Sequence, residues 1–595
     1  MTKAIRLAAD IGGTFTDIAL DAAGQRHTAK VLTTTAAPEE ALVEGAGLVL
    51  KAAGLNFSDL DQIVHGTTLA TNAIIERKGA RTALIASEGF RDTIEIADES
   101  RFDQYDVFIK KPQPLVPREL RFTVPERVDV TGHVQRPLDE DAVHEVATQL
   151  QRLDVGAVAI AYMHAYAFAD HERRTRDILI ERLPGVAITL SSEACPEVRE
   201  YERTSTSVAN AYVQPLMAGY LQRLNDSLSA LGSRAPLHLM TSGGTLTSVD
   251  TAARFPIRLV ESGPAGGAIL AARLAAERGE DQILSFDMGG TTAKICLIED
   301  GSPLKARSFE VDRSARFMKG SGLPVRIPVI EMIEIGAGGG SIARVDQLGR
   351  VQVGPESAGS SPGPACYGRG GVHPTVTDAD VALGHIDPDA FAGGTITLDG
   401  QASRTALAAH IGEVMSYSTE VAAFAVNEVV DENMVNAARV HAVERGIDIA
   451  GRTLVAFGGA APLHACRLAQ KLGINRVIIP PDAGVGSAIG FLEAPAAFEI
   501  VHSQFVKLDE FDASAANALL EGLTKEATQL ASSAALGAEL ATHRQVFARY
   551  AGQGHEVAIE LPDGQLDETT PATLRRLFEA EYDRLFARHI PGSKI

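Results

Sequence analysis

Short apolar runs alternate with longer amphipathic stretches along the first part of the chain. The runs "IRLAAD" and "IALDA" predict two strands joined by the glycine turn "IGGTFTD". Amphipathic patterning predicts helices at 38–54 and 139–153, the first with Pro38 near its start. Further strands are predicted at 62–66, 81–90 and 155–166, and a further helix at 67–79. This alternation predicts an α/β architecture.

A second α/β region is predicted from residue 186. Helices are predicted at 207–231, 261–279 and 421–446. Two apolar strands that end in glycine are predicted within 283–298 and 452–473. Glycine is dense from 335 to 375, which predicts mobile or ligand-shaped loops. Beyond "AIGFLEAP" the pattern changes to that of a smaller α+β appendage. We therefore expect three consecutive domains, at 1–185, 186–495 and 496–595, which agrees with the chain length.

One glycine turn occurs twice in the sequence. Asp10-Ile11-Gly12-Gly13-Thr14 returns as Asp287-Met288-Gly289-Gly290-Thr291, 277 residues later (287 minus 10), and Thr292 follows the second copy. Glycine lets the backbone approach a ligand closely, and amide and hydroxyl groups can donate to phosphate oxygens. An aspartate at the end of a strand can hold Mg²⁺ directly or through water. One copy alone could equally be an ordinary hairpin turn, but the repetition favours a phosphate and metal site.

The turns differ from the common nucleotide motifs. No Gly-Lys-Ser/Thr follows, as a P-loop requires, and a strand rather than a helix comes next, unlike a dinucleotide site. A third element, "LVAFGGAAPLHA" at 454–465, is an apolar strand that ends in Gly458-Gly459 before a helix. Bare backbone there could receive adenosine, although helix packing also favours glycine.

Composition narrows the functional classes. The net charge of −21 argues against nonspecific binding to nucleic acid or an anionic membrane, although backbone amides and a metal can still attract phosphate. Four cysteines are scattered singly, so we expect reduced thiols and a cytoplasmic protein. The N-terminus resembles no secretory signal, and no apolar run reaches transmembrane length.

The two Asp-Gly-Gly-Thr turns and the apolar-Gly-Gly strand resemble the phosphate and adenosine signatures of the sugar kinase–actin–chaperone ATPase superfamily. That resemblance implies two ribonuclease-H-like lobes of the actin-like ATPase type, with the smaller C-terminal α+β domain beside them. Longer blocks resemble one family within it: the A-type subunits of ATP-dependent hydantoinases, the N-terminal half of 5-oxoprolinase and the β subunits of acetone and acetophenone carboxylases. The blocks include "VHGTTLATNAIIERKGARTALIASEGFRD", "MTSGGTL", "ESGPAGGA", "EIGAGGGSIARVD", "GPACYGRGG", "PTVTDAD" and "RYAGQGHEV".

The family resemblance implies an activity. Its members are expected to bind ATP and phosphorylate the carbonyl oxygen of a small-molecule substrate, a hydantoin, 5-oxoproline or a lactam, so that a stable cyclic amide can be hydrolysed. A B-type subunit is expected to complete the reaction in a heteromer. Ketone carboxylation is the alternative reaction, and a nucleotide-gated scaffold is the alternative of another class. Family members usually continue beyond a segment like "PGSKI", so we expect the 496–595 domain to be cut short at Ile595.

The sequence thus predicts a set of site residues. Asp10 and Asp287 are the expected catalytic acids and the ligands of Mg²⁺, with Mn²⁺ as a substitute. His65, at a strand end, is either a catalytic contact or a structural helix cap. The expected ATP-binding residues are Gly12, Gly13, Thr14, Gly289, Gly290, Thr291, Thr292, Gly263, Gly266, Gly458 and Gly459.

A second metal such as Zn²⁺ is a weaker prediction. Cys366, His373 and Asp378 are close in sequence, but their spacing fits no standard zinc site. A packed cysteine among polar loop residues is the preferred interpretation.

Overall fold

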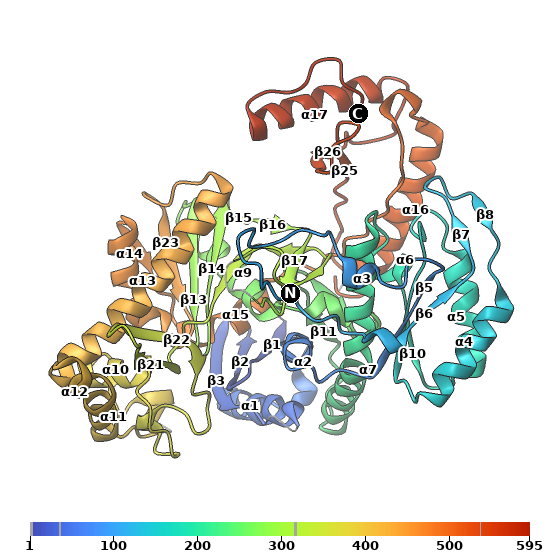
Figure 1. Ribbon diagram of the computed structural model, residues 1–595. Helices are drawn as coiled ribbons and strands as arrows, with labels where there is room; N and C mark the ends of the chain where they lie inside the picture. The colour runs from blue at the N-terminus through green and yellow to red at the C-terminus, as the bar shows by residue number, and fades with distance from the viewer. Residues whose placement is uncertain (1–3, 35–36, 315–317, 395, 536) are drawn as a thin grey trace. The chain divides into compact units, whose positions relative to one another are not determined.

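The computed structural model describes residues 4–34, 37–314, 318–394, 396–535 and 537–595 (Figure 1). The chain forms two compact units, each assembled from separate stretches of sequence. Unit 1 comprises Met1–Glu76, Leu216–Phe309 and Ile327–Pro495, and unit 2 comprises Arg77–Pro215, Glu310–Arg326 and Ala496–Ile595. This division differs from the three consecutive domains predicted above, which remain a proposal.

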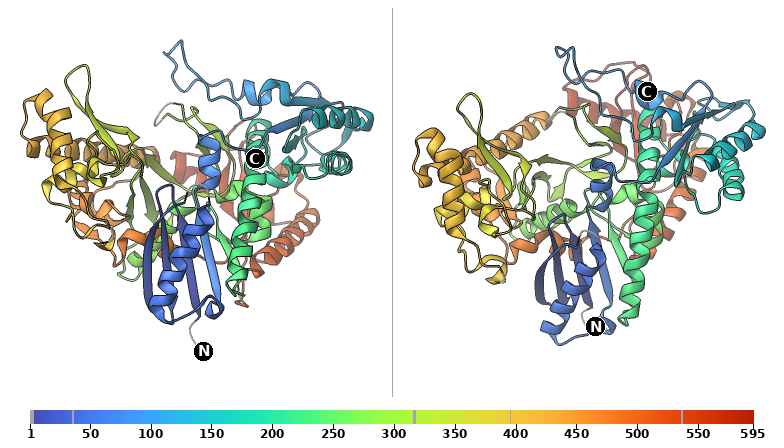
Figure 2. Two further views of the ribbon diagram at one scale, coloured as in Figure 1. Left: turned by 90° about the horizontal axis from the view of Figure 1, so that it is seen from below. Right: turned by 60° about the horizontal axis from the view of Figure 1, so that its bottom comes forward.

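The first sheet of unit 1 has the strand order β12-β11-β4-β1-β2-β3. Its strands are β1 (Ile5–Ile11), β2 (Phe15–Ala22), β3 (Gln25–Leu32), β4 (Gln62–Thr67), β11 (Leu237–Met240) and β12 (Leu246–Ser248). Helix α1 (Pro38–Ala53) lies across β2 and β3, as Figure 2 shows. It begins at Pro38, which lacks the N–H that a first turn leaves unpaired, and it ends at left-handed Gly54. Both ends agree with the sequence prediction.

The second sheet of unit 1 has the order β15-β14-β13-β23-β24, and β20 also pairs with β14. Its strands are β13 (Ile283–Met288), β14 (Ala293–Glu299), β15 (Ser302–Pro303), β20 (Met332–Ile335), β23 (Thr453–Phe457) and β24 (Arg476–Ile478). Helices α13 (Thr419–Arg445) and α14 (Ala461–Leu472) pack against it (Figure 1). Around them lie α10 (Val376–Leu383), α11 (Gly400–Leu407) and the hairpin of β21 (Ser341–Val345) and β22 (Val351–Ser357).

The two sheets of unit 1 repeat one topology. In the first, β2 is antiparallel to β1 and β4 is parallel to β1 on its other side. In the second, β14 and β23 hold the same places beside β13. A further antiparallel strand follows in each, β3 beside β2 and β20 beside β14. The repeated glycine turn therefore belongs to a repeated structural unit.

Two glycine-rich helices of unit 1 cross closely. They are α9 (Ser262–Ala276) and α15 (Gly486–Glu493). A Cβ on Gly490 would collide with the carbonyl oxygen of Gly266, so only glycine permits this approach. The apolar stretches "ESGPAGGA" and "AIGFLEAP" thus pack against each other.

Unit 2 contains a parallel sheet with the order β10-β9-β5-β6. Its elements are β5 (Thr82–Ser87), β6 (Arg121–Val124), β9 (Ala157–Ala161), β10 (Ala187–Leu190), α4 (Glu140–Arg152) and α5 (Asp170–Arg182). Strands β5 and β9 are buried along their whole length, as the continuous runs "TALIAS" and "AVAIA" require. The C-terminal part contains α16 (Ala513–Ser532), β25 (Gln545–Ala548), β26 (Val557–Glu560) and α17 (Thr570–Phe586).

Two helices differ in length from the prediction. The helix expected at 67–79 is α2 (Leu69–Ile75), and it stops early because Arg77 takes a left-handed φ of 56°. The helix expected at 207–231 is α7 (Glu200–Ala230), which starts seven residues earlier and continues through Pro215. Among the described residues, no helix is long and apolar enough to span a bilayer.

Candidate functional site

The two predicted turns have the same backbone hydrogen bond. Gly12 N donates to the Phe15 carbonyl oxygen over 3.0 Å, and Gly289 N donates to that of Thr292 over 3.1 Å. The second bond is the first one shifted by 277 residues. Within the described part of the chain, the amides of Gly13, Thr14, Gly290 and Thr291 donate to no other residue. Two equivalent turns therefore present amide groups that can donate to a ligand.

Each turn follows a strand whose penultimate residue is an aspartate with an ionisable cross-strand partner. Asp10 pairs with Asp17 across β1 and β2, and Asp287 pairs with Lys294 across β13 and β14. The sites thus carry opposite charges at the same place in the repeat, seven residues after the aspartate. Sequence reasoning missed Lys294, although extending the repeat comparison by a few residues finds it.

In each sheet, the next strand carries a charge opposite to that of Asp17 or Lys294. Lys30 on β3 pairs with Asp17 in register, and its ammonium forms an ion pair with that carboxylate. Glu334 on β20 pairs with Lys294 in register, with 3.5 Å between Oε1 and Nζ. The residues in register are therefore an acid, an acid and a base on β1, β2 and β3 of the first sheet. On β13, β14 and β20 of the second sheet they are an acid, a base and an acid.

A glycine from a distant segment lies against each aspartate. A Cβ on Gly263, in the first turn of α9, would lie 2.9 Å from Asp10 Oδ2 and 3.0 Å from Oδ1. A Cβ on Gly458, which follows β23, would collide with Asp287 Oδ1. The structure thus brings predicted residues together in two pairs, Gly263 with Asp10 and Gly458 with Asp287.

Burial, together with the charges of Asp17 and Asp287, raises the pKa of Asp10 to about 7 against the opposing effect of Lys294 and Lys30. Asp10 Oδ1 is a buried atom with no hydrogen-bond partner among the described residues. An unpartnered carboxylate oxygen next to backbone amides is a fitting ligand for a hard cation.

Burial also raises the pKa of Asp287, to about 6. Lys294 and a hydrogen bond with Ser487 of α15 act against this rise, which explains the lower value. Because Asp287 affects the pKa of Asp10, the ends of the two sheets share one electrostatic site. Near neutral pH we therefore expect Asp10 to be close to half-ionised and Asp287 to be mostly ionised.

The glycine-rich loop at 336–340 packs on the second turn. Gly339 N donates to the Gly289 carbonyl oxygen over 3.0 Å, and Gly340 N donates to that of Gly290 over 2.7 Å. A Cβ on Gly338 would lie 2.6 Å from the Thr291 carbonyl carbon, so this contact requires glycine. The loop thus supports the turn by donating to the carbonyl groups of Gly289 and Gly290.

The third predicted turn closes against the second sheet. Gly458 has a φ of 94° and donates its N–H to the Ala483 carbonyl oxygen over 2.8 Å. Ala460 N donates to the Met288 carbonyl oxygen over 2.9 Å, which fixes the start of α14 beside β13. Gly459 is exposed and has open space where a Cβ would stand. The turn therefore leaves bare backbone next to Asp287.

Comparison with known proteins gives the family. Residues 6–183 match the model of the hydantoinase/oxoprolinase N-terminal region, and residues 203–500 match the hydantoinase/oxoprolinase model. The chain belongs to the hydantoinase/oxoprolinase family. This confirms the family resemblance found in the sequence.

One curated family member is caprolactamase subunit alpha of Pseudomonas jessenii, which is 34% identical over 601 residues, covering 99% of this chain and 85% of that one. The solved ATP-dependent caprolactamase of Pseudomonas jessenii has a TM-score of 0.82 at 33% identity and covers 99% of this chain and 85% of its own. The nucleotide-free acetone carboxylase structure has a TM-score of 0.81 at 26% identity, covering 99% and 86%. These matches confirm the α/β fold, and both solved relatives are ATP-dependent by name.

In this hydantoinase/oxoprolinase fold, each ring nitrogen of His65 has a hydrogen-bond partner. Its Nδ1 is 3.0 Å from the Ala9 carbonyl oxygen, and its Nε2 is 2.7 Å from the Tyr220 hydroxyl. It is in register with Ala9, one residue from Asp10, so its side chain points to the opposite face of the sheet. Burial lowers the pKa of His65 to about 4, which keeps the ring neutral. These contacts favour the structural interpretation.

Two α9 glycines next to Gly263 pack against the protein. Cβ atoms on Gly266 and Gly267 would stand within about 2.7 Å of Phe491 and Phe457, respectively. Gly266 therefore leaves room for α15, and its contact with ATP stays a prediction.

The suggested second-metal residues do not form one cluster. Asp378 accepts hydrogen bonds from the backbone of Ala365, Cys366 and Thr375 and from the side chains of Thr375 and Ser403. Cys366 is buried, whereas His373 is exposed, with its ring 4.9 Å from that of His410. Within the described ranges, no group of three or more His, Cys, Asp or Glu residues could hold a metal. Asp378 thus organises the loop before α10.

A buried charge cluster that the sequence did not reveal supports the third turn. His464 of α14 lies 2.8 Å from Asp431 of α13, Nδ1 to Oδ1, and its Nε2 lies 3.5 Å from Asp380 Oδ2 of α10. Burial acts to lower the pKa of His464, but the hydrogen bonds and charges of both aspartates outweigh it and raise this pKa to about 10. The imidazolium therefore joins three helices behind Gly458-Gly459.

This cluster predicts a pH-dependent stability. A histidine with a raised folded pKa stabilises the fold fully below its unfolded pKa, near 6.5, and loses this contribution as pH rises to 10. Between pH 7 and 9.5 we expect the wild type to lose on the order of 3 kcal/mol more than His464→Gln. Thermal unfolding at both pH values measures the difference. His133→Gln is the control, because that side chain is 84% exposed. Equal pH dependence in wild type and His464→Gln would contradict the buried charge.

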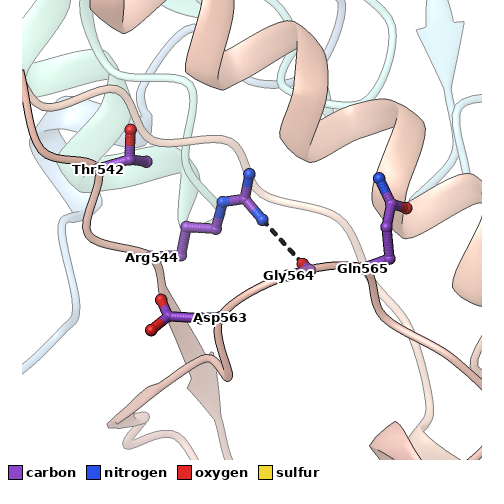
Figure 3. A pocket seen from close by; sticks show the side chains of 5 residues that line it. All are labelled: Thr542, Arg544, Asp563, Gly564 and Gln565. Atoms are coloured by element: carbon purple, nitrogen blue, oxygen red, sulfur yellow. Dashed lines mark hydrogen bonds between the residues drawn. The ribbon is translucent and has the colours of Figure 1, made fainter.

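A small cavity of about 280 Å³ lies at the open end of the β25–β26 hairpin (Figure 3). Arg544 closes one side of it and donates to the Gly564 carbonyl oxygen over 3.2 Å. Thr542, Asp563 and Gln565 complete the lining. None of the predicted site residues lines this cavity.

Proposed function

We propose that this chain is the ATP-binding A-type subunit of an ATP-dependent cyclic-amide hydrolase that acts on a hydantoin, 5-oxoproline or a lactam. One observation carries the proposal: two equivalent hairpin turns place Asp10 and Asp287 in a single electrostatic site. The two repeated sheets then correspond to the two lobes of an actin-like ATPase. The ATP-dependent caprolactamase, similar along 99% of this chain, supports the same class of substrate.

The residues present fit Mg²⁺ and a nucleoside triphosphate. Asp10 Oδ1 is buried without a described partner, and the open amides of Gly13 and Gly290 suit phosphate oxygens. When bound, Mg²⁺-ATP supplies the phosphoryl group that turns a resistant carbonyl oxygen into a leaving group. Asp10 would hold the metal or its water shell, and Asp287 would hold metal or orient the attacking oxygen.

The turns and their supports provide the remaining functions in this proposal. Gly12, Thr14, Gly289, Thr291 and Thr292 shape the two phosphate contacts. Gly458 and Gly459 give adenosine access to bare backbone, and Gly263 lets the start of α9 approach Asp10. Gly263 and Gly458 fit these roles because a Cβ at either position would meet a site aspartate.

Ketone carboxylation is the second candidate. The acetone carboxylase structure, with a TM-score of 0.81, supports it almost as well as caprolactamase supports lactam hydrolysis. Either reaction uses an activated carbonyl, and in either case we propose a B-type subunit as partner. Caprolactamase subunit alpha is itself named as one subunit of its enzyme.

ATP hydrolysis by the purified chain tests the proposal, measured alone and with a co-expressed B-type subunit. Hydantoin, 5-oxoproline, caprolactam and acetone are offered in turn, with Mg²⁺ present or chelated. We expect Mg²⁺-dependent turnover that one of the cyclic amides stimulates. Stimulation by acetone with bicarbonate instead would establish the carboxylase, and turnover indifferent to every carbonyl compound would favour a scaffold.

A further inference from the structure

Lys294 is a half-buried cation beside the second aspartate. Its side chain is 16% exposed, and its Nζ lies 3.4 Å from Glu261 Oε2 and 3.5 Å from Glu334 Oε1. Both distances are longer than a strong charge-assisted hydrogen bond. Two carboxylates therefore lie near the ammonium, but neither forms a short hydrogen bond with it.

Lys30, the corresponding cation of the first sheet, is held differently. Its ammonium forms a close ion pair with Asp17 and also donates to the Gly484 carbonyl oxygen over 3.0 Å. An ammonium has three donors, and these contacts fix two of them at short range. Of the two lysines whose charges affect Asp10 and Asp287, Lys294 is the one with the looser contacts.

The site as a whole needs a positive charge to bind phosphates. Asp10, Asp17 and Asp287 are all acidic, and a nucleoside triphosphate adds further negative charge. A single Mg²⁺ leaves part of this repulsion, so a nearby ammonium stabilises the bound anion. Lys294 stands on the strand that leaves the second glycine turn, four residues after Gly290.

We propose that Lys294 binds the phosphate chain of the nucleoside triphosphate, and that Glu261 and Glu334 position its ammonium for this contact. The inference rests on the proposed ATP-binding function and adds the residue that distinguishes a triphosphate from a nucleoside. Glu261 precedes α9 in a left-handed conformation, two residues before Gly263, so it couples the ammonium to the segment that lies against Asp10. The charge reversal between the two hairpins then makes them unequal: the second has an ammonium at the strand position where the first has the carboxylate of Asp17.

Calorimetric binding tests this without relying on turnover. A non-hydrolysable ATP analogue, ADP and adenosine are titrated into wild type, Lys294→Met and Lys294→Arg, each with Mg²⁺. We expect Lys294→Met to weaken the triphosphate analogue by about 10- to 100-fold, ADP by less, and adenosine by less than about twofold. Lys294→Arg keeps the charge and is expected to recover most of the loss. Lys51→Met, an exposed lysine of α1, is the control for a general loss of charge.

The outcomes separate this inference from the proposed function. If wild type binds neither ATP analogue nor ADP, the proposed function fails. If wild type binds the triphosphate and Lys294→Met binds it equally well, or weakens adenosine in the same proportion, the inference is overturned. Should Lys294→Met not fold, Lys294→Gln replaces it, because its amide can still bond with Glu261 and Glu334. We expect this variant also to weaken the triphosphate about 10- to 100-fold and to leave adenosine nearly unchanged, and an unchanged triphosphate affinity overturns the inference.

Discussion

Replacing Asp10 with asparagine is expected to lower Mg²⁺-dependent ATP turnover by about 10³-fold or more and to make the folded protein more stable. The turnover falls because the amide cannot supply the anionic oxygen that the proposed metal needs. The stability rises because the native fold holds a buried carboxylate whose Oδ1 has no described partner. A loss of turnover together with a gain in stability would indicate that Asp10 is retained for function.

The stability gain of Asp10→Asn depends on pH with a definite sign. An acid whose folded pKa is raised from 3.8 to about 7 destabilises the fold progressively as pH rises between these values, and by a constant amount above. Asp10 keeps some solvent exposure, so we discount the full shift and expect the variant to gain about 2 kcal/mol more at pH 8 than at pH 4. Chemical denaturation at the two pH values, beside ATPase assays, measures both effects.

Asp287→Asn is the matched comparison for this prediction. Its folded pKa of about 6 lies closer to the ordinary value because Lys294 and Ser487 partly compensate the buried charge. We expect a comparable loss of turnover with a smaller gain in stability. If Asp10→Asn kept its turnover, or were less stable than wild type at pH 8, the metal-binding role of Asp10 would be refuted.

The turns themselves could be predicted because their signal is local. Gly12 and Gly289 each follow an apolar strand, and the spacing of the acid, glycines and threonine repeats without a gap. The strand–turn–strand structure then follows from hydrophobic patterning alone. The helix at Pro38 and the buried strands of unit 2 could be predicted for the same reason.

The contacts between segments could not be predicted from local patterns. Gly263 and Asp10 are 253 residues apart (263 minus 10), and no property of either stretch indicates that one lies against the other. His65 shows most clearly what local sequence patterns cannot predict. A histidine at a strand end is a reasonable catalytic candidate, but the pleat directs its side chain to the face opposite Asp10. The His464 cluster was missed because its three residues lie on separate helices.

Gly458→Ala is expected to cost about 3 kcal/mol of stability or more and about 10²-fold in turnover. Gly458 has a φ of 94°, which any side chain disfavours, and this alone costs about 1–2 kcal/mol. The added Cβ would also stand 2.6 Å from the Met288 carbonyl oxygen and collide with Asp287 Oδ1. The steric clash of the added Cβ therefore lies at the proposed site.

Gly473→Ala separates the two costs. Gly473 caps α14 with a φ of 73°, but the nearest heavy atom to its Cβ position is 3.9 Å away, so that variant suffers the backbone cost alone. We expect it to lose about 1 kcal/mol and to keep full turnover, whereas Gly458→Ala loses turnover even at temperatures where it stays folded. Denaturation curves and ATPase rates of both variants decide this. Equal losses of stability in the two would mean that Asp287 Oδ1 and the Met288 carbonyl do not crowd Gly458, because these contacts are what make Gly458→Ala more costly than Gly473→Ala.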